Sequence, residues 1–426
     1  MRILFQTLGS RGDVQPYVAL GAELRKRGHE VTLSTGRGFE AMIEAAGLRA
    51  APLSDDVLDL LQTPEVQEAL RSFAGKLRAW RAFRGLARRQ LDEMADVGLA
   101  LRPDLIVYHP KAMAGPSLGE VLGVPAIPSY LQPVYVPTGA FANPILPFES
   151  VGRLGNRLSH RATHGLVTLA TSGQIKTWRR EKLGLSGKMP AHVLDGYDPD
   201  GGAVPRLHAH SRHLVPRPAD WGPREKVTGY WFTAPKRDWT PPPELMRFLE
   251  AGPPPVYVGF GSLPTEDARR TSETVIEAFR RAGKRGLLAT GWGGLADPGA
   301  AADLHVLETA PHDWLFPRCS AVVHHGGAGT THEGLRWGRP SVICPVFGDQ
   351  PFWGRRVQAL GAGPAPLPQK RLTAGALAEA LRAVEAPAVR ERAAELGGLL
   401  REEPGAAAAA DAIEAFTAAQ GRLETV

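Results

Sequence analysis

The segment 322–350, VVHHGGAGTTHEGLRWGRPSVICPVFGDQ, constrains the fold more than any other part of this sequence. An apolar run at 321–323 predicts a strand, glycines follow the two histidines, and a helix should begin near Thr330. Glycines lack a Cβ atom, so the backbone can turn tightly and approach a ligand closely. The free N–H groups and the positive dipole end of the helix would face that ligand. The pattern therefore predicts a diphosphate site in an α/β fold.

Other nucleotide-binding motifs fit this sequence less well. No lysine follows these glycines, although a Walker A loop requires one. A dinucleotide fold would place GxGxxG after the first strand and an acid about twenty residues later, but the early turn is GSRGDV and the second strand ends at 34–36 without a carboxylate. Glu333 lies eight positions after His325, about two helical turns on, where it could hold a ribose. This spacing indicates a sugar nucleotide.

Length and composition predict a soluble globular protein with two domains, since the chain has 426 residues and 43% of them are hydrophobic. We expect a cytoplasmic protein, because the N-terminal apolar run is too short for a signal peptide and nowhere do about eighteen apolar residues follow one another. Cys319 and Cys344 are the only cysteines, and their apolar surroundings are typical of buried reduced thiols.

Basic residues gather within the segment 65–95. They alternate with apolar side chains and are Arg71, Lys76, Arg78, Arg81, Arg84, Arg88 and Arg89. This pattern predicts a basic amphipathic helix, which either packs its apolar stripe on the domain or forms a peripheral contact with a membrane or an acceptor; both interpretations stay open. The net charge of +6 is modest for this length, and we expect no nucleic-acid partner.

Strand and helix patterns alternate in two series along the chain. The first runs from RILFQT to VPAIPSYLQ at 124–132, and the second runs from PVYVGFGS at 255–262 to the end. Residues 196–243 between them are rich in Pro, Gly and Trp, which is typical of a linker. Right-handed crossovers would make each series a parallel sheet. The loops GSRGDVQP, GFGSLP and HHGGAGTT would then lie at carboxyl ends of strands, where such folds bind ligands.

Six long motifs follow one another along nearly the whole chain: GSRGDVQPYVALGAEL, IKTWRREKLGL, HLVPRPADWGPREKVTGYWF, GFGSLP, PHDWLFPRCSAVVHHGGAGTT and PVFGDQPFWGRRV. In this order they resemble the family 1 glycosyltransferases, especially the bacterial and fungal sterol glucosyltransferases and the glycopeptide-antibiotic glycosyltransferases. The resemblance implies a GT-B fold, an α/β architecture of two doubly wound Rossmann-like domains that face each other across a cleft. It also implies an acceptor-binding domain at 1–205, a linker at 206–243, a donor-binding domain at 244–405 and a C-terminal helix at 406–426 that packs back toward the first domain.

Asp13 stands where sterol and antibiotic relatives carry an aspartate, so the resemblance implies that it is the general base. A carboxylate with a reference pKa of about 3.9 cannot deprotonate an alcohol beforehand and must take the proton as the bond forms. The alternative is that Asp13 only caps a helix that begins near Val14. Its neighbours Ser10, Arg11 and Gly12 are expected on the acceptor side.

The same resemblance places the donor on the second domain. His325 should touch the diphosphate and stabilise charge on the leaving nucleotide without a metal, together with Gly327, Gly329 and Thr330. Successive side chains of a strand point to opposite faces, so His324 should pack in the core. A zinc site that includes His332 is not expected, because no CxxC or HExxH spacing accompanies the histidines.

Other positions match family residues that hold the sugar or the base. Asp349 and Gln350 correspond to the Asp-Gln pair that binds sugar hydroxyls, and Ser262 corresponds to a hydroxyl beside the diphosphate. His312 stands near the position where plant relatives place a Trp and a Gln on the base, so base recognition departs from the family pattern. Trp292 and Trp314 are candidates for stacking on the base.

The resemblance implies inverting transfer of a hexose, glucose in the first instance, from a UDP-sugar to a hydroxyl of a hydrophobic acceptor such as a sterol, terpenoid, carotenoid or polyketide. The nucleotide sugar is a co-substrate, and no metal or other cofactor is expected. Three alternatives stay open: an antibiotic glycosyltransferase that uses a dTDP- or UDP-sugar, a UDP-sugar 2-epimerase, and a non-catalytic nucleotide-sugar-binding protein.

Overall fold

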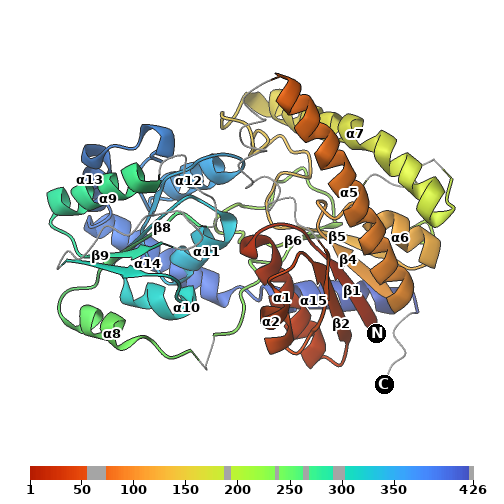
Figure 1. The fold of residues 1–426 in the computed structure, drawn as a ribbon, viewed down its shortest axis with the longest axis horizontal. Helices are drawn as coiled ribbons and strands as arrows, with labels where there is room; N and C mark the ends of the chain where they lie inside the picture. The colour runs from red at the N-terminus through yellow and green to blue at the C-terminus, as the bar shows by residue number, and fades with distance from the viewer. Residues whose placement is uncertain (55–72, 187–192, 236–238, 262–267, 291–302, 422–426) are drawn as a thin grey trace.

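The computed structural model describes residues 1–54, 73–186, 193–235, 239–261, 268–290 and 303–421, and it contains two α/β domains (Figure 1). The elements of the first domain are β1 (Arg2–Gln6), α1 (Arg11–Lys26), β2 (Glu30–Thr35), α2 (Glu40–Ala45), β3 (Arg49–Pro52), α5 (Phe73–Leu101), β4 (Leu105–Tyr108), α6 (Gly115–Leu122), β5 (Ala126–Tyr130), α7 (Gly152–Leu183), β6 (Arg206–His208) and β7 (Glu225–Val227). The elements that follow are α8 (Pro243–Glu250), β8 (Val256–Gly259), α9 (Ala268–Ala282), β9 (Gly286–Ala289), β10 (Leu304–Leu307), α10 (His312–Leu315), β11 (Ala321–His324), α11 (Ala328–Arg336), β12 (Ser341–Ile343), α12 (Gln350–Ala359), α13 (Ala374–Ala383), α14 (Pro387–Glu402) and α15 (Ala406–Ala419).

Seven parallel strands form the first sheet, in the order β3-β2-β1-β4-β5-β6-β7. The interior strand β1 reads RILFQ, and its apolar residues on both faces are buried, as expected for a parallel strand covered by helices. In register, Phe5 lies beside Leu33 of β2 and Val107 of β4. The carboxyl ends of β1 and β4 are therefore neighbours, and the loops that follow them share one edge of the sheet.

The second sheet has five parallel strands in the order β10-β9-β8-β11-β12. β11 lies between β8 and β12, with Val323 beside Val258 and Val342. All three of these side chains are fully buried in one apolar core. The predicted fold of two doubly wound parallel sheets is confirmed.

The predicted linker 206–243 begins too early. Residues 206–208 and 225–227 form β6 and β7, which extend the first sheet beyond β5. Leu207 pairs with Ser129 and is fully buried in the first core. Strands of three residues, separated by Pro- and Gly-rich turns, are too short to show a hydrophobic period.

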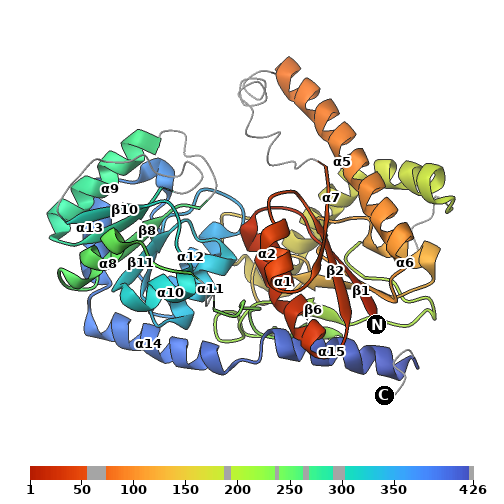
Figure 2. The same cartoon turned by 60° about the horizontal axis from the view of Figure 1, so that its bottom comes forward.

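The chain returns to the first domain at its C-terminal end. Figure 2 shows α14 and α15 one after the other along one side of both domains. α15 packs on α1, and its Ala409, Ala410 and Ile413 are buried in the core of the first sheet. Arg27 adds ion pairs to two acids of α15, Asp411 at 2.6 Å and Glu414 at 2.7 Å.

Two long helices, α5 and α7, lie in contact on the outer side of the first domain (Figures 1 and 2). α5 covers residues 73–95 of the predicted basic amphipathic segment, and residues 65–72 lie outside the described residues. Within the described residues, no helix combines the length and the apolar character needed to cross a bilayer.

Candidate active site

The predicted turn after β11 has the geometry that requires glycine. Gly326 has φ +89°, and a Cβ atom there would lie 2.6 Å from Cγ2 of Ile343 and 3.0 Å from the carbonyl oxygen of Gln350. At Gly327 a Cβ atom would lie 2.6 Å from Nε2 of His325. The backbone thus passes close to the His325 ring, and α11 begins directly afterwards at Ala328.

The two histidines before the turn have different surroundings. His324 is fully buried, and its Nδ1 accepts a hydrogen bond of 3.1 Å from the N–H of Gly326, which helps to shape the turn. His325 is half-buried, and its ring lies beside Gly261, where a Cβ atom would be 2.9 Å from Cε1. Burial lowers the pKa of His325 to about 4, so the imidazole is neutral at neutral pH. The neutral ring can donate a hydrogen bond to an anion. A positive charge on the ring would appear only if a bound anion raised its pKa.

The N-termini of α11 and α1 differ in a way that decides which can bind an anion. The N-cap residue of α11 is Gly327, which has no side chain to satisfy the first N–H groups of the helix. Ser10 is the N-cap of α1, and the carboxylate of Asp13 accepts hydrogen bonds from the Ser10 N–H at 2.9 Å and from the Ser10 hydroxyl at 3.2 Å. In the first domain, the Asp13 carboxylate thus occupies the N-terminus of α1. In the second domain, the N-terminus of α11 is left open for an anionic group of a ligand.

The predicted start of α1 at Val14 is wrong. The helix begins at Arg11, because Ser10 and Asp13 form a capping box, and Asp13 occupies the third helical position. Arg11 and Gly12 are exposed on the first turn, and Nε of Arg11 donates to Gln15 at 3.2 Å. Asp13 is buried and combines a capping contact with a place at the carboxyl edge of the sheet.

Lys111 is the partner of Asp13 that the sequence analysis missed. Its Nζ lies 2.6 Å from Oδ1 of Asp13, and its backbone N–H donates to Nδ1 of His109 at 3.1 Å. Burial alone would raise the pKa of Asp13, but the charge and hydrogen bond of Lys111, with the Ser10 N–H, outweigh burial and lower it. His109 stays neutral, since burial lowers its pKa to about 3. The available signal was the polar run HPK directly after β4, a neighbour of β1.

Lys111 also acts on the second domain. Burial raises the pKa of Asp349, the charge of Lys111 opposes this shift, and the charge of Asp13 adds to it. The Asp349 carboxylate accepts a hydrogen bond of 2.7 Å from Nε1 of Trp353. One cation therefore lies within electrostatic reach of a carboxylate from each domain.

Gln350 and Glu333 are partly engaged within the protein. Oε1 of Gln350 accepts hydrogen bonds from the N–H groups of Val346 at 2.8 Å and Phe347 at 3.3 Å, so its amide N–H groups are what it can offer a sugar. Glu333 accepts a hydrogen bond of 2.7 Å from Nε1 of Trp337, and burial raises the pKa of its carboxyl group.

The candidate base-binding residues are less well placed. His312 packs with its ring stacked on Phe316 at 4.3 Å and its Nε2 3.3 Å from the Tyr257 hydroxyl. Trp314 packs against Trp239 and beneath the Arg318 guanidinium, which lies 4.0 Å from the ring centre. Ser262 and Trp292 lie outside the described residues.

His332 takes part in packing between the domains. Its Nδ1 lies 2.7 Å from the carbonyl oxygen of Ala328, and its Nε2 accepts from the N–H of Ser211 at 3.1 Å. Its ring stacks on Tyr230 at 4.5 Å. In the part of the chain that the structure describes, no three His, Cys, Asp or Glu side chains are arranged to hold a metal ion.

Both halves of the chain match known protein families. Residues 3–138 match the glycosyltransferase family 28 N-terminal domain, and residues 301–416 match the erythromycin biosynthesis protein CIII-like C-terminal domain. A sterol 3-beta-glucosyltransferase of Arabidopsis thaliana is 34% identical over 426 residues, which cover 97% of this chain and 67% of that protein. The chain belongs to the family 1 GT-B glycosyltransferases.

Further relatives agree with this membership. A second A. thaliana sterol 3-beta-glucosyltransferase is 35% identical to this chain, and the match covers 97% of this chain and 65% of that protein. A sterol 3-beta-glucosyltransferase from Aspergillus fumigatus is 36% identical, and the match covers 97% of this chain and 30% of that protein. The chain thus spans about two thirds of the plant relatives and under a third of the fungal one. The solved structures of the kitacinnamycin glycotransferase (TM-score 0.71, 22% identity, 97% of this chain and 98% of that one) and of the calicheamicin glycosyltransferase CalG4 (0.68, 22%, 98% and 98%) share its fold.

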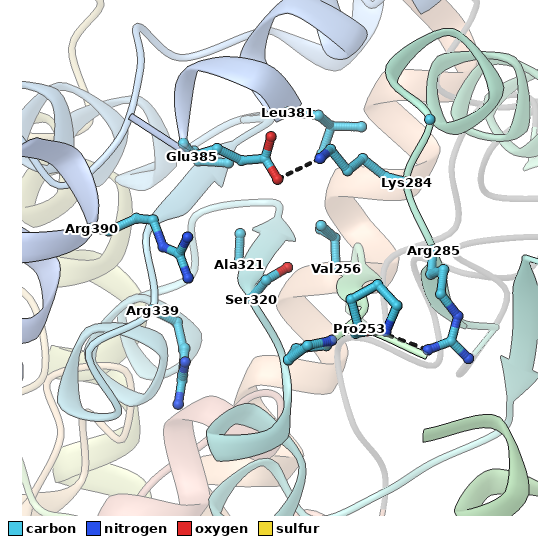
Figure 3. A pocket seen from close by; sticks show the side chains of 13 residues that line it. Pro253, Val256, Lys284, Arg285, Ser320, Ala321, Arg339, Leu381, Glu385 and Arg390 are labelled. Atoms are coloured by element: carbon cyan, nitrogen blue, oxygen red, sulfur yellow. Dashed lines mark hydrogen bonds and ion pairs between the residues drawn. The ribbon is translucent and has the colours of Figure 1, made fainter. Parts of the chain in front are cut away.

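A cationic hollow on the second domain lies at the other end of the sheet from the glycine turn. It opens at the first residues of β8 and β11 and has a volume of about 230 Å³ (Figure 3). Lys284 pairs there with Glu385, and Arg285 donates to the carbonyl oxygen of Pro253 at 2.8 Å. Pockets for small organic ligands usually measure roughly 300–1,000 Å³. This hollow is smaller than that, so the glycine turn remains the place where we expect the nucleotide of this GT-B chain.

If the nucleotide binds at the glycine turn, adding one methyl group at Gly327 should weaken its binding. The substitution Gly327→Ala would force the His325 ring to move and would narrow the approach to the N-terminus of α11. We expect about tenfold weaker UDP binding by calorimetry, equivalent to roughly 1.4 kcal/mol. Gly398→Ala in α14, where an added Cβ meets nothing within 4 Å, is the matched control and should bind UDP normally. Unchanged UDP affinity in the Gly327 variant would contradict the assignment.

Proposed function

We propose that this chain transfers a hexose, with inversion, from a UDP-sugar to a hydroxyl group of a hydrophobic, sterol-like acceptor, and that the hexose is glucose. Two features carry the proposal together. One domain holds a buried ionised carboxylate, Asp13, and the other domain has a glycine turn that leaves a helix N-terminus uncapped. The similarity to sterol 3-beta-glucosyltransferases over 97% of the chain supports the choice of donor and acceptor.

The donor diphosphate lies, in this proposal, on the N–H groups of Gly327, Gly329 and Thr330. His325 is neutral in the free protein, and a phosphate beside it would favour the protonated form and raise its pKa. Charge that develops on the leaving nucleotide would therefore strengthen the interaction during the reaction, without a metal ion. Asp349 and Gln350 hold sugar hydroxyls, and the carboxylate oxygen of Glu333 that Trp337 leaves open holds the ribose.

Asp13 acts as the general base in this proposal. The acceptor oxygen forms its bond to the anomeric carbon while the bond from that carbon to the diphosphate oxygen breaks, and the electron pair leaves with UDP. The acceptor proton passes to Asp13 in the same step, because the lowered pKa of Asp13 is far too low to deprotonate an alcohol beforehand. Lys111 keeps Asp13 ionised where burial would otherwise favour its protonated form.

An apolar rim supports a hydrophobic acceptor. Ile145 and Phe148 of the loop after β5 are exposed, and so are Val346 and Phe347 in the loop before α12. The same β5 loop contacts the second domain, where the rings of Phe141 and Phe352 lie 5.6 Å apart. Both domains therefore expose large apolar side chains on loops, and one of these loops reaches the other domain.

The test of the proposal is acceptor-dependent UDP release from UDP-glucose, measured with a panel of sterols and other hydrophobic alcohols, with and without EDTA. Asp13→Asn preserves the shape and a hydrogen-bonding side chain but removes the base, so we expect turnover to fall about 10²–10⁴-fold with UDP affinity unchanged. Asp104→Asn makes the same chemical change at an exposed ion pair with Arg2 and should keep full turnover. Full turnover in Asp13→Asn would refute the base assignment, and loss of turnover in EDTA would refute metal independence.

The pH dependence of kcat/KM tests the role of Lys111. Groups that surround Asp13 and its partner are His109, Tyr17, Tyr135, Tyr230 and Asp349. Lys111 lowers the pKa of Asp13, so activity in the native protein should fall only at acid pH, as pH drops through that lowered value. In Lys111→Met the pKa of Asp13 rises, and the acid limb should move to higher pH; Lys111→Arg should move it back. A uniform loss at every pH would show that Lys111 only supports the fold.

A further inference from the structure

Helix α7 carries an apolar stripe on the side that faces solvent. Leu154, Leu158, Leu166 and Leu169 have exposed fractions of 74%, 54%, 70% and 79%. They are three, four or eight positions apart along the helix, and the exposed Ala162 fills the wider gap, so they share one face. The opposite face is buried and largely polar, with Asn156, Ser159 and His160. This is the reverse of the usual arrangement, in which a surface helix turns its leucines toward the core.

The first part of the buried face of α7 is held by polar contacts, whereas Ile175, Trp178 and Leu183 pack in the core toward its end. The side-chain amide of Asn156 donates to the carbonyl oxygen of Gly139 at 3.0 Å and accepts from the N–H of Val151 at 2.9 Å. The Ser159 hydroxyl accepts from the N–H of Asn143 at 2.8 Å. Polar contacts therefore fix this part of α7 on the domain, and the leucine stripe is left for another surface.

The charges around the stripe have one sign. Between Gly152 and Arg180 the helix contains no Asp or Glu, and its exposed cations are Arg153, Arg161, Lys176 and Arg180. A second copy of the chain that packed its own stripe on this one would bring these cations against each other, which costs energy. An apolar stripe with cations at its flanks is instead the pattern that binds the headgroup region of an anionic bilayer.

We propose that α7 docks the protein on the surface of an anionic lipid bilayer, with its leucines among the acyl chains and its cations at the headgroups. The proposal rests on the proposed function in one respect: a sterol-like acceptor resides in such a bilayer. Val151, at the start of the stripe, adjoins the loop that carries the exposed Ile145 and Phe148. An acceptor could thus pass from the bilayer along this loop toward Asp13.

This surface differs from the membrane contact considered for the segment 65–95. In α5, Arg88 forms ion pairs with Asp92 at 3.2 Å and with Glu181 of α7 at 2.7 Å. Its charge is therefore neutralised at the contact between α5 and α7. Among the described residues, the leucines of the α7 stripe remain exposed. We therefore place the proposed contact on α7.

The test is flotation of the full chain with phosphatidylcholine vesicles that contain or lack phosphatidylglycerol, without donor or acceptor. We expect binding to the anionic vesicles, and about tenfold weaker binding in Leu169→Asp. Val167→Asp is the matched control: it is 45% exposed on the same helix, but two residues before Leu169 it points to another face, and it should bind much better than Leu169→Asp. Equal binding by both variants, or no binding by the native chain, would overturn the proposal.

Charge is tested by a second matched pair. Arg161→Glu/Lys176→Glu should abolish the preference for phosphatidylglycerol, because Arg161 follows Leu158 by three positions and Lys176 follows Leu169 by seven. Arg49→Glu/Lys226→Glu makes the same change in net charge on exposed residues of β3 and β7 and should keep the preference. A native dimer in light scattering that Leu169→Asp separates would also overturn the proposal, because a second copy would then cover the stripe. Vesicle binding requires no turnover, so UDP release with a detergent-dispersed acceptor separately reports whether the proposed function fails.

Discussion

The ion pair between Asp13 and Lys111 is the contact on which the rest of the site depends. A buried carboxylate is expensive unless a cation and hydrogen-bond donors compensate for its lost water, and here Lys111 and the Ser10 N–H do so. The pair joins the first turn of α1, which follows β1, to the loop after β4. β1 and β4 pair side by side in the first sheet. Because Lys111 also acts on Asp349, the ionisation of the first domain is linked to the residue that is proposed to hold the sugar on the second.

The two domains share a strand-turn-helix arrangement, but they differ in whether the N-terminus of the helix is already satisfied by a carboxylate. In each, an interior parallel strand ends at a turn and a helix begins there, and the two helices, α1 and α11, contact each other. Asp13 satisfies the N-terminus of α1, whereas Gly327 leaves the N-terminus of α11 open. In the proposed function, this difference is why the anionic donor is placed on the second domain.

The sequence predicted what depends on local pattern. Alternating strands and helices identified both sheets, and the glycines after His325 identified the turn, since no Cβ fits at Gly326. Two kinds of feature were missed: very short strands, and contacts between residues far apart in the sequence. β6 and β7 are short and are recognised only by the strands they pair with, and Lys111 meets Asp13 across 98 positions of sequence. The start of α1 was misplaced because the carboxylate of Asp13 was considered as an N-cap, when Ser10 holds that position and Asp13 closes the capping box.

The most direct test of the account is a crystal structure of the full chain with UDP bound. The diphosphate should lie on the N–H groups of Gly327, Gly329 and Thr330 with a hydrogen bond from His325, and the ribose should reach Glu333. Asp13 and Lys111 should remain paired on the facing domain. A diphosphate bound instead among Arg339, Arg390 and Lys284 at the opposite end of the second sheet would contradict the account.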